Sequence, residues 1–151
     1  MKVKIGKYPK HRWYHNWLFE KFGILNNAKV SVHIEDFDTW SMDHTLSYII
    51  EPMLKQLKLS KHGASYVSPE DVPGELRPTK EEATAWEVDF ETDSKYFDRW
   101  DWVLDEMIFA FGSYRTSHEW DNLSFDEYKK REERVSNGLI LFGKYYGALW
   151  D

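Results

Sequence analysis

The apolar residues between Trp40 and Leu59 constrain the fold of this chain more than any other feature of the sequence. They recur at intervals of three and four residues, which places them on one side of an α-helix. Ser41 is a suitable N-cap, and Gly63 can end the helix. Pro52 removes one backbone hydrogen bond inside the segment, so we expect a bend. The pattern predicts a kinked helix in the middle of a core. Its apolar stripe consists of Leu46, Ile49, Ile50, Met53, Leu54 and Leu57.

Composition limits the class of protein. The chain has 151 residues, which fits one domain, 1–151, with one core. The net charge of -6 argues against non-specific binding to nucleic acid, which requires clustered Lys and Arg. The absence of cysteine excludes disulfides and thiolate metal sites. No apolar run is long enough to span a membrane, so we expect a soluble protein of the cytoplasm.

Periodicity also predicts the other elements. Alternating apolar residues indicate two short strands, and three-four spacing indicates three further helices. In chain order these are a strand at 3–5, a helix at 11–22, a strand at 30–34, a helix at 96–111 and a helix at 125–149. We therefore expect an α+β fold that is mostly helical. It would have about four helices around one core and a small ribbon of two or three strands.

The segment at about 60–93 shows no such periodicity. Three prolines, at 69, 73 and 78, and two glycines interrupt it, and its second half is acidic. Proline and glycine oppose regular elements in the interior of a segment. The sequence therefore predicts a long acidic, proline-rich loop here.

Three aspartates form a row on the helix predicted at 96–111. Asp98, Asp101 and Asp105 fall at i, i+3 and i+7 and share one side, and Glu51 on the first helix described above could face them. Carboxylates on facing helices can hold Mg²⁺ for nucleotide hydrolysis. The alternative is an acidic stripe that is solvated or paired with arginines of the last helix. The histidines lack metal-ligand spacing, so we expect no metal and no cofactor.

A second group of candidates could bind an anionic ligand. Arg131 and Arg134 lie about one turn apart, and arginine can grip a phosphate with two parallel hydrogen bonds. Gly138 would let a ligand approach the backbone. A structural salt bridge to the aspartate row is the competing interpretation. The predicted ligand-binding set is Arg131, Arg134, Gly138 and Tyr145 on the last helix, with Trp40 and His44.

Four blocks of sequence carry a resemblance to known proteins. They read VHIEDFDTWSMDHTLSYIIEPMLKQLK, KHGASYVSPEDVP, RWDWVLDEMIFAF and RVSNGLILFGKYYGALWD, and they cover roughly half the chain. On these blocks the chain resembles a family of small uncharacterised proteins carried by tailed bacteriophages. Members of that family have a longer segment between the third and last helices. The resemblance implies a phage protein that acts in the cytoplasm of the infected bacterial host, and it assigns no functional residue.

Three functions remain open from the sequence. The first is a non-enzymatic protein that binds a small anionic ligand, such as a nucleotide-type immune signal of the host. The second is a metal-dependent nucleotide hydrolase that uses the aspartate row and Glu51. The third is an acidic inhibitor that binds a host protein. The sequence leaves the oligomeric state open, and we expect no membrane partner.

Overall fold

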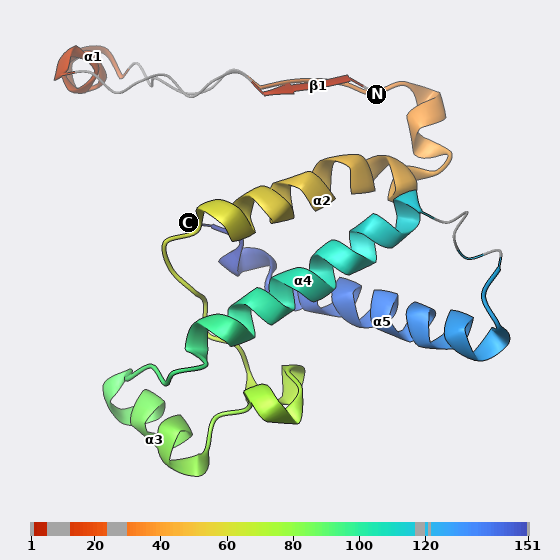
Figure 1. Ribbon diagram of the computed structural model, residues 1–151. Helices are drawn as coiled ribbons and strands as arrows, with labels where there is room; N and C mark the ends of the chain where they lie inside the picture. The colour runs from red at the N-terminus through yellow and green to blue at the C-terminus, as the bar shows by residue number, and fades with distance from the viewer. Residues whose placement is uncertain (1, 6–12, 24–29, 117–119, 121, 151) are drawn as a thin grey trace. The chain divides into compact units, whose positions relative to one another are not determined.

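The structure, a computed structural model, describes residues 2–5, 13–23, 30–116, 120 and 122–150 (Figure 1). They belong to two compact units, Met1–Thr45 and Leu46–Asp151. The described residues include five α-helices, so the mostly helical class predicted from the sequence is confirmed. The prediction of a single domain stays a prediction.

The first unit contains short elements only. In chain order these are β1 (Lys2–Ile5), α1 (Trp13–Phe22), β2 (Val30–His33) and the 3-10 helix η1 (Asp36–Thr39). β1 pairs antiparallel with β2, so that Lys2 lies opposite His33 and Ile5 lies opposite Val30. No residue within 14–23 or 31–45 is buried. The predicted packing of a strand ribbon on the helical core stays a prediction.

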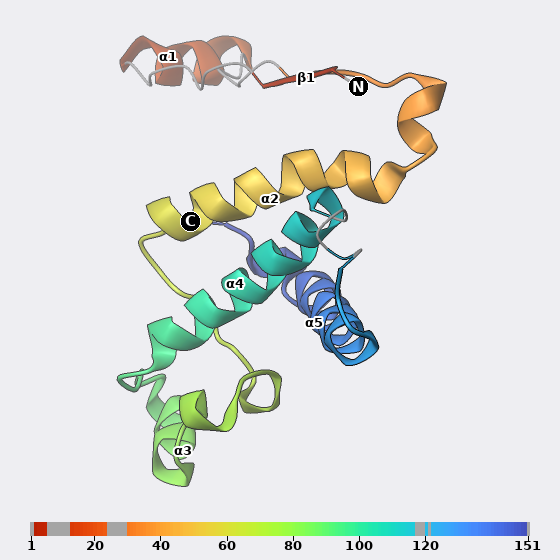
Figure 2. The ribbon, with the colours of Figure 1, turned by 45° about the vertical axis from the view of Figure 1, so that its right-hand side comes forward.

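The second unit contains the core. Its elements are most of α2 (Met42–Ser60), the 3-10 helices η2 (Pro69–Asp71) and η3 (Gly74–Leu76), α3 (Lys80–Asp89), α4 (Tyr96–Arg115), α5 (Phe125–Lys144) and the 3-10 helix η5 (Tyr146–Ala148). α4 lies between α2 and α5 in both ribbon views (Figures 1 and 2). Trp100, Val103 and Leu104 on α4 are almost completely buried, so α4 is the centre of this core.

The position of α2 differs from the prediction. α2 lies at the edge of the core, and only part of its apolar stripe is covered. Leu54 is buried and Ile50 is half-buried, whereas Met53 is 58% exposed. The prediction that this helix occupies the middle of the core is therefore wrong. The apolar stripe of α2 is wider than the part of it that the rest of the second unit covers.

The segment at 60–93 is also more regular than predicted. Thr79 and Glu82 form a capping box, in which each side chain accepts a hydrogen bond from the other residue's backbone, and this box begins α3. The indole of Trp86 on α3 stacks between Tyr66 and Tyr96, with ring centroids 5.2 and 5.1 Å away. The prediction of a long loop without regular elements is wrong, because the prolines precede or begin helices here and do not interrupt them.

Candidate functional site

Arg134 and Gly138 lie where α4 and α5 pack together. The guanidinium of Arg134 donates hydrogen bonds to both carboxylate oxygens of Glu106, with an Nη2–Oε1 distance of 2.7 Å, and Glu106 is 6% exposed. A Cβ at Gly138 would lie 2.3 Å from the Glu106 carbonyl oxygen and 2.7 Å from the Ala110 Cβ. Glycine is therefore needed for the close approach of two helices. The space that we expected a ligand to occupy beside Gly138 is filled by α4.

Arg131 lies one turn before Arg134, among aromatic rings. Its guanidinium carbon is 5.5 Å from the ring centre of Phe109 and 5.1 Å from that of Trp120, and its Nη2 donates to Thr116 Oγ1 at 3.2 Å. Cation–π contacts of this kind hold an arginine against its own protein. Arg131 therefore ties α5 to the C-terminal end of α4 and to the segment that follows.

Tyr145 lies at the other end of α5 and is buried. Its hydroxyl donates to Asp71 Oδ2 at 2.5 Å and accepts a hydrogen bond from the Ser68 backbone N–H at 2.9 Å. Burial, together with the hydrogen bond to Asp71, raises the pKa of Tyr145 above its ordinary value of 10.0. Lys144 forms an ion pair with Asp71 at 2.6 Å. Tyr145 therefore fixes the segment around η2 to α5.

Trp40 and His44 belong to the first unit. Trp40 is 86% exposed, and His44 is half-buried. The other four predicted ligand-binding residues belong to the second unit, where they make the separate contacts given above. The predicted pocket that would join all six residues stays a prediction.

Two of the three aspartates in the row form ion pairs with lysines. One of these lysines lies on α2, and the other directly follows this helix. Asp105 Oδ1 lies 2.6 Å from Lys58 Nζ, and Asp101 Oδ1 lies 3.1 Å from Lys61 Nζ. Asp98, at the start of α4, is exposed. The predicted pairing of this row with the arginines of the last helix is wrong for Asp101 and Asp105, because both face α2.

Glu51 makes the third contact between α2 and α4. Its carboxylate pairs with Lys55 at 2.6 Å and with Arg115, and a Cβ at Gly112 would lie 3.3 Å from its Oε1. Burial favours the neutral acid, but the hydrogen bonds from Lys55 and Arg115 outweigh it and hold the pKa of Glu51 below its ordinary 4.5. From the N-terminus of α2 onward, each successive contact reaches a residue that is closer to the N-terminus of α4. The two helices are therefore antiparallel.

A second acidic residue is held in a similar way near the start of α4. Asp93 pairs with Arg99, which is 4% exposed and also donates to the Leu76 carbonyl oxygen at 3.1 Å. Burial opposes the charge of Asp93, but the hydrogen bonds from Arg99 hold its pKa below the ordinary 3.8. A hollow of about 170 Å³ lies between this ion pair and the ring stack of Trp86. Among the described residues, no group of three or more acidic or histidine side chains is arranged to hold a metal ion.

One feature of the second unit that sequence reasoning missed is an apolar groove with a volume of about 620 Å³. It runs between α2 and the C-terminal end of α5 with η5. Met53 and Tyr146, on its two walls, are 58% and 68% exposed. The sequence signal was the excess width of the α2 stripe. The groove is lined by Ile50, Met53, Leu54, Leu57, Phe142, Tyr146 and Leu149.

Taken together, Arg131, Arg134, Glu51, Asp101 and Asp105 are engaged in contacts within the second unit, whereas the apolar groove is open. Apolar walls of this kind favour binding by burial of apolar surface. Every helix among the described residues is too short or too polar to cross a lipid bilayer. Comparisons of this chain with protein-family models, with curated proteins and with solved structures found no match.

Proposed function

We propose that this chain is a non-enzymatic binding protein that holds a helical segment of a polypeptide in the groove between α2 and α5. The groove itself carries the proposal. Its lining residues recur at i, i+3, i+4 and i+7 on α2, and at i, i+4 and i+7 from Phe142 to Leu149. Apolar side chains from two segments thus line one groove, as in sites that bind the apolar face of an amphipathic helix.

A polypeptide fits this groove better than a small polar ligand does. A volume of about 620 Å³ would hold either. A small-molecule site, however, combines apolar walls with a few polar groups that fix the ligand's orientation. Here the Tyr146 hydroxyl is the only polar side-chain group among the lining residues. The orientation of a partner in this groove would therefore be set by the spacing of the partner's own apolar side chains.

The second unit as a whole is acidic, because residues 46–151 contain thirteen Lys and Arg but twenty-one Asp and Glu. This excess attracts a basic partner to the unit, but it does not select a charge at the groove. The segments 50–57 and 142–149, which line the groove, carry Lys55, Lys144 and one acidic residue, Glu51, which is buried. The resemblance to phage proteins supports a site of action in the infected bacterium. Nucleotide binding or hydrolysis has less support, because Arg134, Asp101 and Asp105 are engaged in ion pairs.

The test uses a labelled model peptide with leucine at i, i+3, i+4 and i+7 and lysines at both ends. Fluorescence anisotropy should show saturable binding to the parent protein. Met53→Asp places a charge in the groove and should weaken binding at least about tenfold, whereas Phe125→Asp, at an 80% exposed position at the start of α5, should not. A scrambled peptide without an apolar face is the peptide control. Equal affinity of both variants, or no binding by the parent, would contradict the proposal.

A further inference from the structure

We propose that the hollow of about 170 Å³ beside Trp86 binds an alkylguanidinium cation, the group that ends an arginine side chain. The hollow shares no lining residue with the groove between α2 and α5, so the inference goes beyond the proposed function and does not depend on it. Three features support it: the size of the hollow with its fixed aromatic wall, the charges that line it, and the acidity of the surrounding segment.

The hollow has an aromatic wall that is already in place. Trp86 stacks between Tyr66 and Tyr96, and the Tyr96 hydroxyl donates a hydrogen bond to the Ala64 carbonyl oxygen at 3.3 Å. Rings fixed in this way reduce the entropy that is lost when a ligand binds. Sites for drug-sized ligands have volumes of roughly 300–1,000 Å³. A hollow of about 170 Å³ therefore accepts one group of side-chain size.

Glu82 supplies a carboxylate that the described part of the chain leaves without a cation. It lines the hollow, and its Oε2 accepts a hydrogen bond from the Thr79 backbone N–H at 2.7 Å. No described residue forms an ion pair with Glu82 or donates a hydrogen bond to its Oε1. A cation in the hollow can therefore form a charge-assisted hydrogen bond with Glu82, and such bonds are stronger than those between neutral groups.

The other two charged residues of the hollow neutralise each other. Arg99 donates hydrogen bonds to both carboxylate oxygens of Asp93 and to the Leu76 carbonyl oxygen, and the side chains of Arg99 and Asp93 are 5% and 8% exposed. An anion could pair with Arg99 only by displacing Asp93, and a buried carboxylate that loses its partner is strongly destabilising. The hollow therefore favours a cation over an anion.

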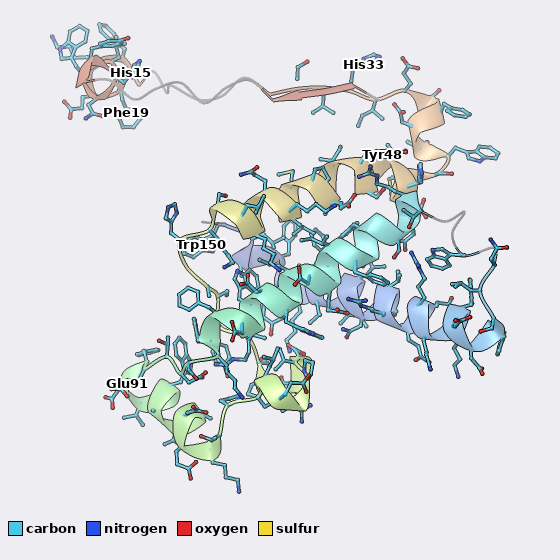
Figure 3. All side chains as sticks on the ribbon, in the orientation of Figure 1. His15, Phe19, His33, Tyr48, Glu91 and Trp150 are labelled. Carbon is cyan, nitrogen blue, oxygen red and sulfur yellow. The ribbon has the colours of Figure 1, made fainter. Side chains whose placement is uncertain are left out.

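The segment around the hollow adds attraction at longer range. Residues 75–99 contain eight Asp and Glu but four Lys and Arg. Glu91, which follows α3, is exposed and projects outward in Figure 3, so it does not line the hollow but adds to the negative charge near it. An excess of one sign near a hollow raises the local concentration of ligands with the opposite charge.

The walls favour a guanidinium over an ammonium group. Besides the aromatic rings, the hollow is lined by Pro69, Pro78 and Ala83, whose side chains are apolar. Guanidinium is planar and more weakly hydrated than ammonium, so it loses less hydration on entering such a space, and it packs flat against rings.

The experiment titrates the full chain with butylguanidinium in a calorimeter at low salt. The parent should bind it saturably. Butylurea, which has nearly the same shape but no charge, should bind at least about tenfold more weakly, because it forms no charge-assisted hydrogen bond.

Two matched variants test the charge of Glu82. Glu82→Gln should weaken the binding of butylguanidinium at least about tenfold. It should leave the melting temperature nearly unchanged, because glutamine also serves at this position of a capping box. Glu81→Gln removes the same charge from the neighbouring residue, which is exposed and does not line the hollow, and should keep the affinity of the parent.

A third variant tests the space. Ala83 lines the hollow, so Ala83→Leu should fill it and abolish binding, while the melting temperature is kept or raised. Binding that survives Ala83→Leu in the folded protein would overturn the hollow as the site. Equal weakening by Glu82→Gln and Glu81→Gln would overturn it too, since the general acidity of the segment would then explain the attraction.

A second titration identifies the source of the cation. The peptide acetyl-Gly-Arg-Gly-amide carries the same group on a polypeptide backbone. Tighter binding of the peptide than of butylguanidinium assigns the hollow to an arginine of a protein partner, and binding of the free cation alone assigns it to a small molecule. A parent that binds neither probe contradicts the inference and leaves the groove unaffected.

Discussion

α4 and α2 both present an apolar stripe with three-four spacing, yet the second unit covers one of them and leaves the other partly open. On α4, neighbours on two sides cover Trp100, Val103 and Leu104, and even the charged Arg99 and Glu106 are buried. On α2, the face toward α4 is covered, and the adjoining face forms one wall of the groove. Periodicity therefore identifies which face of a helix is apolar, but it does not tell how much of that face its own chain will cover.

The largest difference between the two helices should appear on truncation of a central side chain. Leu104→Ala on α4 should lower the free energy of unfolding by about 2–5 kcal/mol, because a fully buried residue leaves a cavity. Leu54→Ala on α2 should fall at the lower end of that range, since its surroundings border an open groove and can relax. Urea denaturation followed by circular dichroism measures both. Equal losses would show that α2 is as tightly packed as α4.

The next largest effect concerns the contact of α4 with α5. Gly138→Ala should destabilise the protein by about 1–3 kcal/mol, because its Cβ would overlap the Glu106 carbonyl oxygen. Gly143→Ala, in the same helix but in open space, is the matched control and should stabilise it by up to about 1 kcal/mol. Thermal melting compares the two variants. A stabilising Gly138→Ala would contradict the close approach of these helices.

Acid should weaken the ion pairs that hold α4 at both ends. The pKa values of Glu51 and Asp93 are lowered in the folded state, so their contribution is present above the ordinary values of 4.5 and 3.8 and is lost as pH falls below them. The urea midpoint should therefore decrease as pH drops from about 5 to 3. Glu51→Gln should reduce this decrease. An unchanged pH profile in that variant would show that Glu51 contributes nothing to it.

The smallest effect should come from the open face of α2. Met53→Ala should change the free energy of unfolding by less than about 0.5 kcal/mol, because the side chain is 58% exposed. Urea denaturation measures this change. A loss as large as that of Leu54→Ala would show that Met53 belongs to the core.

The sequence predicted the long helices well because their signals are local. Three-four spacing predicted helices at 96–111 and 125–149, and the structure has α4 at Tyr96–Arg115 and α5 at Phe125–Lys144. α3 was missed because it lacks an apolar stripe, although Thr79 and Glu82 supply the capping signal. It is held instead by the stacking of Trp86 with rings distant in sequence, which no local pattern reveals.

The candidate site was harder to predict for a related reason. Spacing showed that Asp101 and Asp105 share one side of a helix, but it did not show which cations would face them. Lys58 and Lys61 are the nearest only because α2 runs antiparallel to α4. Arg134 likewise met a buried Glu106 on the facing helix. The groove depends on what is left uncovered after all helices have packed, and that is a property of the fold.

The hydrogen bonds of Tyr145 have a consequence for the order of folding. They join residues 77 and 74 positions apart, whereas the Arg134–Glu106 pair spans 28 positions. Closing a longer loop costs more chain entropy, so we expect the α4–α5 hairpin to form first and the segment around η2 to dock last. Tyr145→Phe should then accelerate unfolding and leave the folding rate nearly unchanged. The hydrogen bonds of the Tyr145 hydroxyl would thus be the last of these contacts to form during folding and the first to break during unfolding.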